Sequence, residues 1–149
     1  MPRNVALLPY EAIVLASATQ TATANSATID ARWSQLPDIR LFLDCTAASG
    51  TSPTLDVALQ ITPDGGTTFF SIMRFAQITV AATRQLEFST FRHAGQAASE
   101  AAVADTGGAL AVNGILSKQV RFRWTIAATT PSFTFAIYLV GGQAGSGSY

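Results

Sequence analysis

The sequence predicts an all-β protein, folded as an antiparallel β-sandwich or jelly roll of about eight strands with one long Ala/Gly-rich loop. Three observations support this fold class. Apolar and polar residues alternate with period two in four segments, as in strands that have one buried face. Polar turn residues separate these segments, and no clear helical period intervenes. At 149 residues the chain is long enough for a single domain, which we expect to span residues 1–149.

The strand segments differ in the clarity of their pattern. In the first, Ile39, Leu41 and Leu43 alternate with more polar positions. Short polar stretches at 50–53 and 129–132 separate consecutive clear segments, which favours antiparallel pairing. Five weaker candidates are rich in β-branched or aromatic residues. The clear segments are 39–45, 55–61, 120–126 and 133–139, and the weaker ones are 12–23, 27–31, 69–75, 78–81 and 85–91.

The run Pro63-Asp64-Gly65-Gly66 raises the question of a ligand-holding loop. Pro presets the turn, Asp can accept hydrogen bonds from nearby backbone, and Gly supplies the positive φ of a tight hairpin. A calcium loop needs further oxygen ligands at alternate positions, and a phosphate loop needs to open a helix, whereas a strand pattern follows here. We therefore predict a hairpin rather than a ligand loop.

Three segments contribute no clear strand and lie outside the predicted sandwich. We expect an N-terminal arm at 1–11, a long loop at 94–117 and a linker-like tail at 141–149. Alanines at 97–104 are compatible with one or two helical turns. Two interpretations of the long loop stay open: a mobile insertion, or an arm that orders against a neighbouring subunit.

The charge content restricts the class of partner. Nine Lys and Arg balance nine Asp and Glu, so no basic field attracts nucleic acid or an anionic membrane. Only 12% of residues are charged, about half of the usual share in soluble domains. A surface of Ala, Thr, Ser and Gln suits contact with other protein. We therefore expect a chain that functions within an assembly.

Cysteine content and hydropathy bear on the cellular compartment. Cys45 is the single cysteine, so no internal disulfide forms, and its position in the alternating pattern predicts a core side chain. No window offers the 18 or more apolar residues of a membrane span. Pro9 and Glu11 interrupt the apolar start, which argues against a signal peptide. We expect an unprocessed chain made in the cytoplasm.

Catalytic and metal-binding motifs are not found in the sequence. His93 is the single histidine, and no nucleophile elbow, phosphate loop or dinucleotide fingerprint occurs. Asp38, Asp44 and Asp56 form an acid/base pair only if strands 39–45 and 55–61 are neighbours, and a solvated charge cluster is the simpler interpretation. We expect neither an enzyme nor a cofactor or metal site.

Arg121 and Arg123 lie on one face of a predicted strand, with Trp124 on the other face. They form a short basic stripe without nearby exposed aromatic residues, which argues against nucleic acid. Asp44, Asp56, Glu87 or acidic groups of an adjoining subunit are the expected partners of this stripe. Trp33 and Trp124 are expected to be core or interface anchors.

The run 48–69, with the closing strands 120–126 and 133–140, resembles small β-rich virion proteins of tailed bacteriophages over about half of the chain. The resemblance implies a capsid decoration (cement) protein at the capsid surface that binds the major capsid protein and copies of itself, as a trimer. A tail, neck or head–tail adaptor protein is the first alternative. The second is a carbohydrate- or receptor-binding module, which needs Tyr10, Tyr138 or Tyr149 gathered in a shallow groove.

Contact residues for such a role are expected in the termini and the long loop, because these segments have no evident structural role inside the domain. The two arginines of the basic stripe are also predicted contact residues. The predicted interface residues are Arg3, Asn4, Tyr10, Val103, Leu110, Val112, Arg121, Arg123 and Tyr149.

Overall fold

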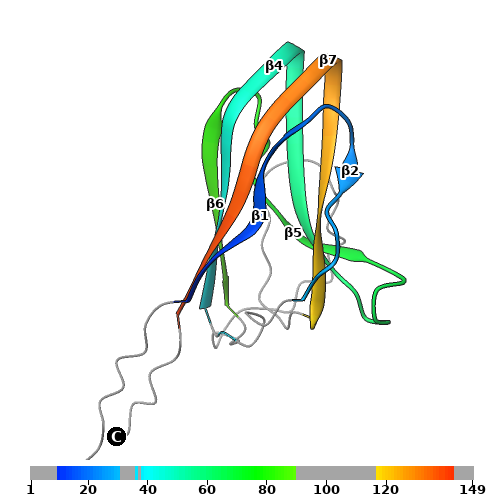
Figure 1. The fold of residues 1–149 in the computed structure, drawn as a ribbon, viewed down its shortest axis with the longest axis vertical. Helices are drawn as coiled ribbons and strands as arrows, with labels where there is room; N and C mark the ends of the chain where they lie inside the picture. The colour runs from blue at the N-terminus through cyan, green and yellow to red at the C-terminus, as the bar shows by residue number, and fades with distance from the viewer. Residues whose placement is uncertain (1–9, 31–35, 37, 90–116, 143–149) are drawn as a thin grey trace, which may run out of the picture.

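The computed structural model describes residues 10–30, 36, 38–89 and 117–142, and all regular structure in these residues is β (Figure 1). No helix in this part of the chain is long and apolar enough to cross a membrane. The predicted all-β antiparallel class is confirmed. The strands are β1 (Tyr10–Gln20), β2 (Ala24–Asn25), β3 (Ile29–Asp30), β4 (Asp38–Ile61), β5 (Phe70–Arg74), β6 (Ala82–Ser89) and β7 (Gln119–Gly142).

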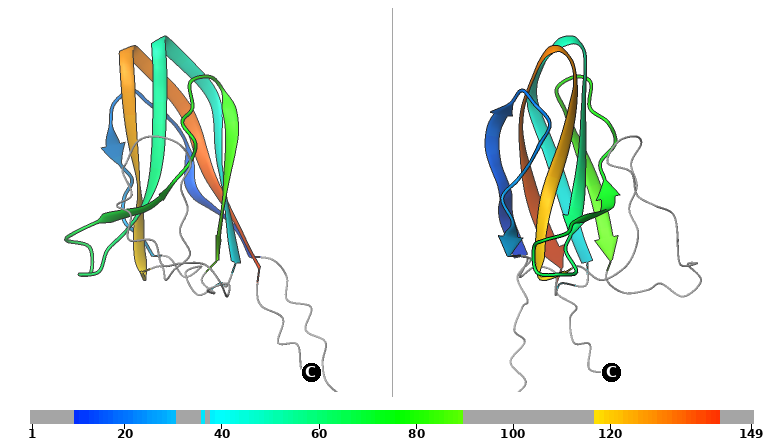
Figure 2. Two further views of the ribbon diagram at one scale, coloured as in Figure 1. Left: turned by 180° about the vertical axis from the view of Figure 1, so that it is seen from behind. Right: turned by 90° about the vertical axis from the view of Figure 1, so that its right-hand side faces the viewer.

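Two long strands, β4 and β7, fold over at their middles and create two layers (Figure 2). The first half of β4 pairs with the second half of β7, and the second half of β4 pairs with the first half of β7. β1 and β6 flank the first pair, and we call these four segments the β1 layer. β2, β3 and β5 flank the second pair and complete the β5 layer.

The order of the segments along the chain is that of a jelly roll. Each segment lies in the layer opposite to the one before it, with two exceptions: β2 and β3 follow each other along the same half of β7, and β4 continues into β5 within one layer. This pairing corrects one sequence-based expectation. Strands 39–45 and 55–61 are not hydrogen-bonded neighbours but lie in opposite layers, because each pairs with a different half of β7.

The polar stretches 50–53 and 129–132 are therefore bends within long strands and not hairpin turns. Gly50 has a φ of 120°, and Ser52 and Thr130 have φ values of 48° and 49°. Positive φ is rare for residues that carry a side chain, so the bend imposes its geometry on both strands. The two bends lie side by side at one end of the molecule, which we call the bend end (Figure 2).

The core lies between the layers and consists of the alternating apolar residues. Trp124 packs edge-on against Phe135 with ring centroids 5.6 Å apart, and its indole nitrogen donates to the Ala22 carbonyl at 3.1 Å. Trp124 and Cys45 are both buried, as predicted. Other fully buried residues include Leu41, Leu43, Leu55, Leu59, Met73, Phe75, Ile78, Phe122, Phe133, Ile137 and Leu139.

The four clear strand predictions are confirmed as halves of β4 and β7. Of the weaker ones, 27–31 shrinks to the two residues of β3, and β6 begins before the predicted 85–91. The prediction for 78–81 is wrong: Ile78 forms an isolated bridge with Leu55, through hydrogen bonds of 2.8 and 2.9 Å, as the chain crosses between layers.

The boundaries of the predicted arm and tail also need correction. Tyr10 and Glu11 belong to β1 and pair with Gly141 and Val140, so the strands extend into both segments. The long loop 94–117 lies outside the described residues except for Ser117.

The strand ends that adjoin the remaining segments lie together at the end opposite the bends, which we call the terminal end (Figure 1). Asp38 pairs with both Ser89 and Gly142, and Tyr10 pairs with Gly141. β7 also begins at this end, where Gln119 pairs with Asp30. Segments 1–9, 90–116 and 143–149 therefore all adjoin the same end of the sandwich.

Candidate functional site

The hairpin between β4 and β5 is held by its own side chains. Asp64 Oδ1 accepts hydrogen bonds from the amides of Thr67 and Thr68, at 3.1 and 2.8 Å, and from the Thr62 hydroxyl at 2.9 Å. The hydrogen bonds from Thr68, the backbone amide first, lower the pKa of Asp64 to about 2. The Thr62 hydroxyl accepts from the Gly66 amide at 2.8 Å. The prediction of a structural hairpin is thus supported.

Of the three carboxylates considered from the sequence for an acid/base pair, Asp44 and Asp56 do not come together, and the side chain of Asp38 lies outside the described structure. Asp44 points out of the β1 layer and accepts a hydrogen bond from Thr83 at 3.0 Å. Asp56 points out of the β5 layer, where Gln77 donates to it at 2.9 Å. The core separates the two carboxylates, because β4 folds over between them. Within the described residues, no group of three or more His, Cys, Asp and Glu is placed to hold a metal ion.

Arg121 and Arg123 lie on the outer face of the β5 layer, as the alternation predicts. Arg121 donates from Nε to Gln60 at 2.7 Å, and its guanidinium stacks 3.9 Å from the centroid of the Phe69 ring. Arg123 donates to Asn25 at 3.3 Å. Phe69 was not predicted as a partner of Arg121, and it reaches the guanidinium because the hairpin folds back beside β7.

Two of the carboxylates expected to pair with these arginines are in the wrong layer. Asp44 and Glu87 both belong to the β1 layer, and Glu87 forms an ion pair with Arg40. The two side chains of this pair are about half and two-thirds exposed, so the pair contributes only about 0.2–1 kcal/mol.

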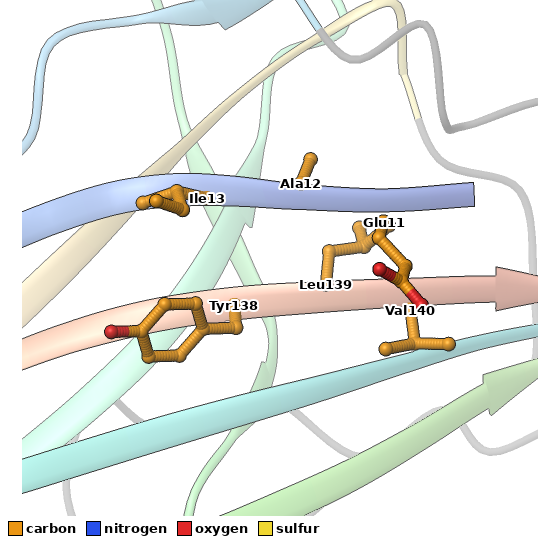
Figure 3. A pocket seen from close by; sticks show the side chains of 6 residues that line it. All are labelled: Glu11, Ala12, Ile13, Tyr138, Leu139 and Val140. Carbon is orange, nitrogen blue, oxygen red and sulfur yellow. The ribbon is translucent and has the colours of Figure 1, made fainter.

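The outer face of the β1 layer, which we call the β1 face, carries an exposed apolar band (Figure 3). Ile13 is 68% exposed, Tyr138 38% and Val140 37%. They are three of the five strongly exposed large apolar side chains in the described part of the chain; Phe70 and Val80 are the others. Tyr138 is paired with Ile13 on one side and with the half-buried Phe42 on the other, so one apolar row crosses three strands.

A shallow hollow of about 420 Å³ lies on this face. Its polar side-chain groups are the Glu11 carboxylate, which lies beside Val140, and the Tyr138 hydroxyl, which lies at the opposite end of the hollow near Ile13 (Figure 3). A sugar site needs several convergent polar groups, whereas an exposed apolar band fits contact with protein. The hollow is lined by Glu11, Ala12, Ile13, Tyr138, Leu139 and Val140.

The structure brings together few of the sequence-predicted contact residues. Tyr10 begins β1 at the terminal end, and its side chain is not described. Tyr138, considered for a carbohydrate site, lies on the β1 face. The others lie outside the described residues: Arg3, Asn4, Val103, Leu110, Val112 and Tyr149, and with them Trp33 and His93.

The sequence did contain a signal for the β1 face. Phe42, Tyr138 and Val140 occupy the outward phase of their strands, where a one-sided strand carries polar residues. Apolar residues in both phases indicate a strand whose outer face also contacts something.

Comparisons with models of protein families, with curated proteins and with solved structures gave no match. The fold and the site geometry therefore define the class of this protein, an all-β antiparallel domain with an exposed apolar face.

Proposed function

We propose that this chain is a structural protein of a tailed-phage virion, a capsid decoration protein that binds the major capsid shell and stabilises it. The observation that carries the proposal is the common position of the unassigned segments: 1–9, 90–116 and 143–149 all adjoin the terminal end. Segments that leave one end of a sandwich are able to reach the same neighbouring surface, and this end is the expected shell-binding end.

The composition supports binding through apolar and backbone contacts. With 12% charged residues and a balanced charge, the chain gains little from long-range electrostatics. On a symmetric shell, each contact of moderate strength is repeated at every equivalent site. Contacts that join neighbouring capsid subunits therefore resist expansion by the packaged DNA collectively, without requiring high affinity at any one site.

Co-sedimentation with expanded empty heads that lack this protein tests the proposal. We expect the chain to pellet with heads and to raise their temperature of disruption. Arg3→Glu, Leu110→Glu and Tyr149→Ala, in the segments that adjoin the terminal end, should weaken binding. Thr51→Lys and Thr129→Lys, at exposed positions of the bend end, are the matched controls and should bind as the parent does.

Two results decide against the proposal. If the chain does not bind heads but binds isolated tails or necks, it belongs to the adaptor or tail class. If the bend-end variants lose binding while the others retain it, the terminal end is not the contact surface.

A further inference from the structure

The β1 face is self-complementary in charge. On β4, three successive outward residues are Arg40, Phe42 and Asp44, a cation and an anion on either side of an aromatic ring. On β7, Val140 and Tyr138 lie beside Arg40 and Phe42 in the same register, whereas Ala136, beside Asp44, is only 3% exposed. When a second copy is rotated by a twofold axis that reverses the strand direction, the cation of one face lies opposite the anion of the other.

We propose that a second copy of this chain packs on the β1 face, related by a twofold axis that runs across the strands along the row Ile13, Tyr138 and Phe42. The strands of the two copies are then antiparallel, and each ring of the row meets its counterpart near the axis. This proposal does not depend on the virion function.

In this arrangement Arg40 of each copy faces Asp44 of the other, which gives two ion pairs per dimer. Val140 of each copy lies over the position of Ala136, which is only 3% exposed within its own chain, so the apolar contact comes from the row at the axis. Glu87 faces the neutral Thr83, which is the cross-strand neighbour of Asp44. Opposite charges therefore meet, and no like charges do, which is the condition for electrostatic complementarity.

The alternative orientation, with the axis parallel to the strands, is less favourable. It places Glu11, at the β1 edge, opposite Glu87, at the β6 edge, and like charges in contact destabilise an interface. It also sets Arg40 and Asp44 against Val140 and Ala136, so neither charge meets an opposite charge of the other copy.

The face is large enough for a stable pair. Four strands about 4.8 Å apart, each rising about 3.3 Å per residue over the 11 residues of β1, give roughly 700 Å² per copy. A standard protein interface buries about 800 Å² per partner. A twofold axis on this face relates one copy to one other copy, so this surface supports a pair, and a trimer has to use other surfaces.

Sedimentation equilibrium of the full chain tests the proposal, with an expected mass of twice 15.6 kDa that falls towards the monomer on dilution. Ile13→Lys and Tyr138→Lys should shift the chain to monomer. Val80→Lys is the matched control, because Val80 is similarly exposed, at 64%, but lies off the face. Circular dichroism of each variant separates loss of pairing from loss of folding.

A mixing experiment tests the orientation. Arg40→Glu places two carboxylates opposite each other, Asp44→Lys places two cations opposite each other, and each variant alone should pair roughly 10-fold more weakly. Mixed in equal amounts, the two variants should form a heterodimer, because the substituted positions then face each other with opposite charge. A monomeric parent, a trimer, or a mixture that does not recover pairing overturns the proposal.

Discussion

The bend in β4 offers the sharpest test of the fold, through the substitution Gly50→Ala. Gly50 has a φ of 120°, a region that residues with a side chain rarely adopt. A methyl group there would lie 3.1 Å from Pro131 Cα and 3.2 Å from the carbonyl oxygens of Thr129 and Thr130. These are backbone atoms of the neighbouring bend, so they cannot rotate away.

The magnitude follows from these two effects. Backbone strain contributes about 1–3 kcal/mol, and forced overpacking about 1–3 kcal/mol. Alanine also lowers the conformational entropy of the unfolded chain, which stabilises the folded state by about 0.4–1 kcal/mol. We expect a net loss of about 1–5 kcal/mol, which corresponds to a fall in Tm of roughly 2–20 °C for a domain of this size.

Urea unfolding, followed by the fluorescence of the buried Trp124, measures this loss. Two glycines serve as controls: Gly65 has a φ of 75° but no heavy atom within 4 Å of an added methyl group, and Gly142 has neither constraint. The expected order of destabilisation is Gly50, then Gly65, then Gly142. If Gly50→Ala lowers stability no more than Gly65→Ala does, the close approach of the two bends is refuted.

Three further predictions concern the hairpin and the core. Asp64 has a folded pKa of about 2, below its ordinary 3.8. Its stabilising effect is therefore present above about pH 4 and is lost as the pH falls towards 2. The difference between the urea midpoints of the parent and of Asp64→Asn should disappear over that range. Trp124→Phe removes the donor that lies 3.1 Å from the carbonyl of the exposed Ala22, where water is able to replace it, and should cost about 0.5–1.5 kcal/mol in urea unfolding; an unchanged midpoint would contradict the role of this hydrogen bond. Burial raises the pKa of Cys45, so a thiol reagent should label it at the rate of unfolding, and rapid labelling of the native chain would contradict the burial.

The inward residues of the fold were predictable from the sequence, and the pairing was not. Leu41 and Leu43 lie in the core because burial selects one phase of a strand, and that phase is visible locally. Gly50 and its neighbours indicate positive φ, which a hairpin turn and a bend both use. The difference lies in the partner: Leu55 pairs with Ile126, far along the chain, and no local signal fixes that choice.

The same limit applies to the candidate site. The outward positions of Phe42 and Tyr138 were readable, but their adjacency depends on the β4–β7 register. Asp56 and Gln60 point outward and yet are buried, because the second half of β4 is covered on both faces. Alternation alone predicts that outward polar residues are exposed, so it did not predict this burial.

The two proposed surfaces together predict the stoichiometry on a shell. The twofold axis across the strands makes the terminal ends of a pair point in opposite directions, so only one end of each pair is able to contact a given shell. Saturated heads should therefore carry two copies per site, with the second copy projecting outward. Asp44→Lys, which weakens pairing but lies away from the terminal end, should bind heads with one copy per site. Quantitative gel analysis of purified heads measures this ratio, and equal copy numbers for the parent and the variant would show that pairing does not persist on the shell.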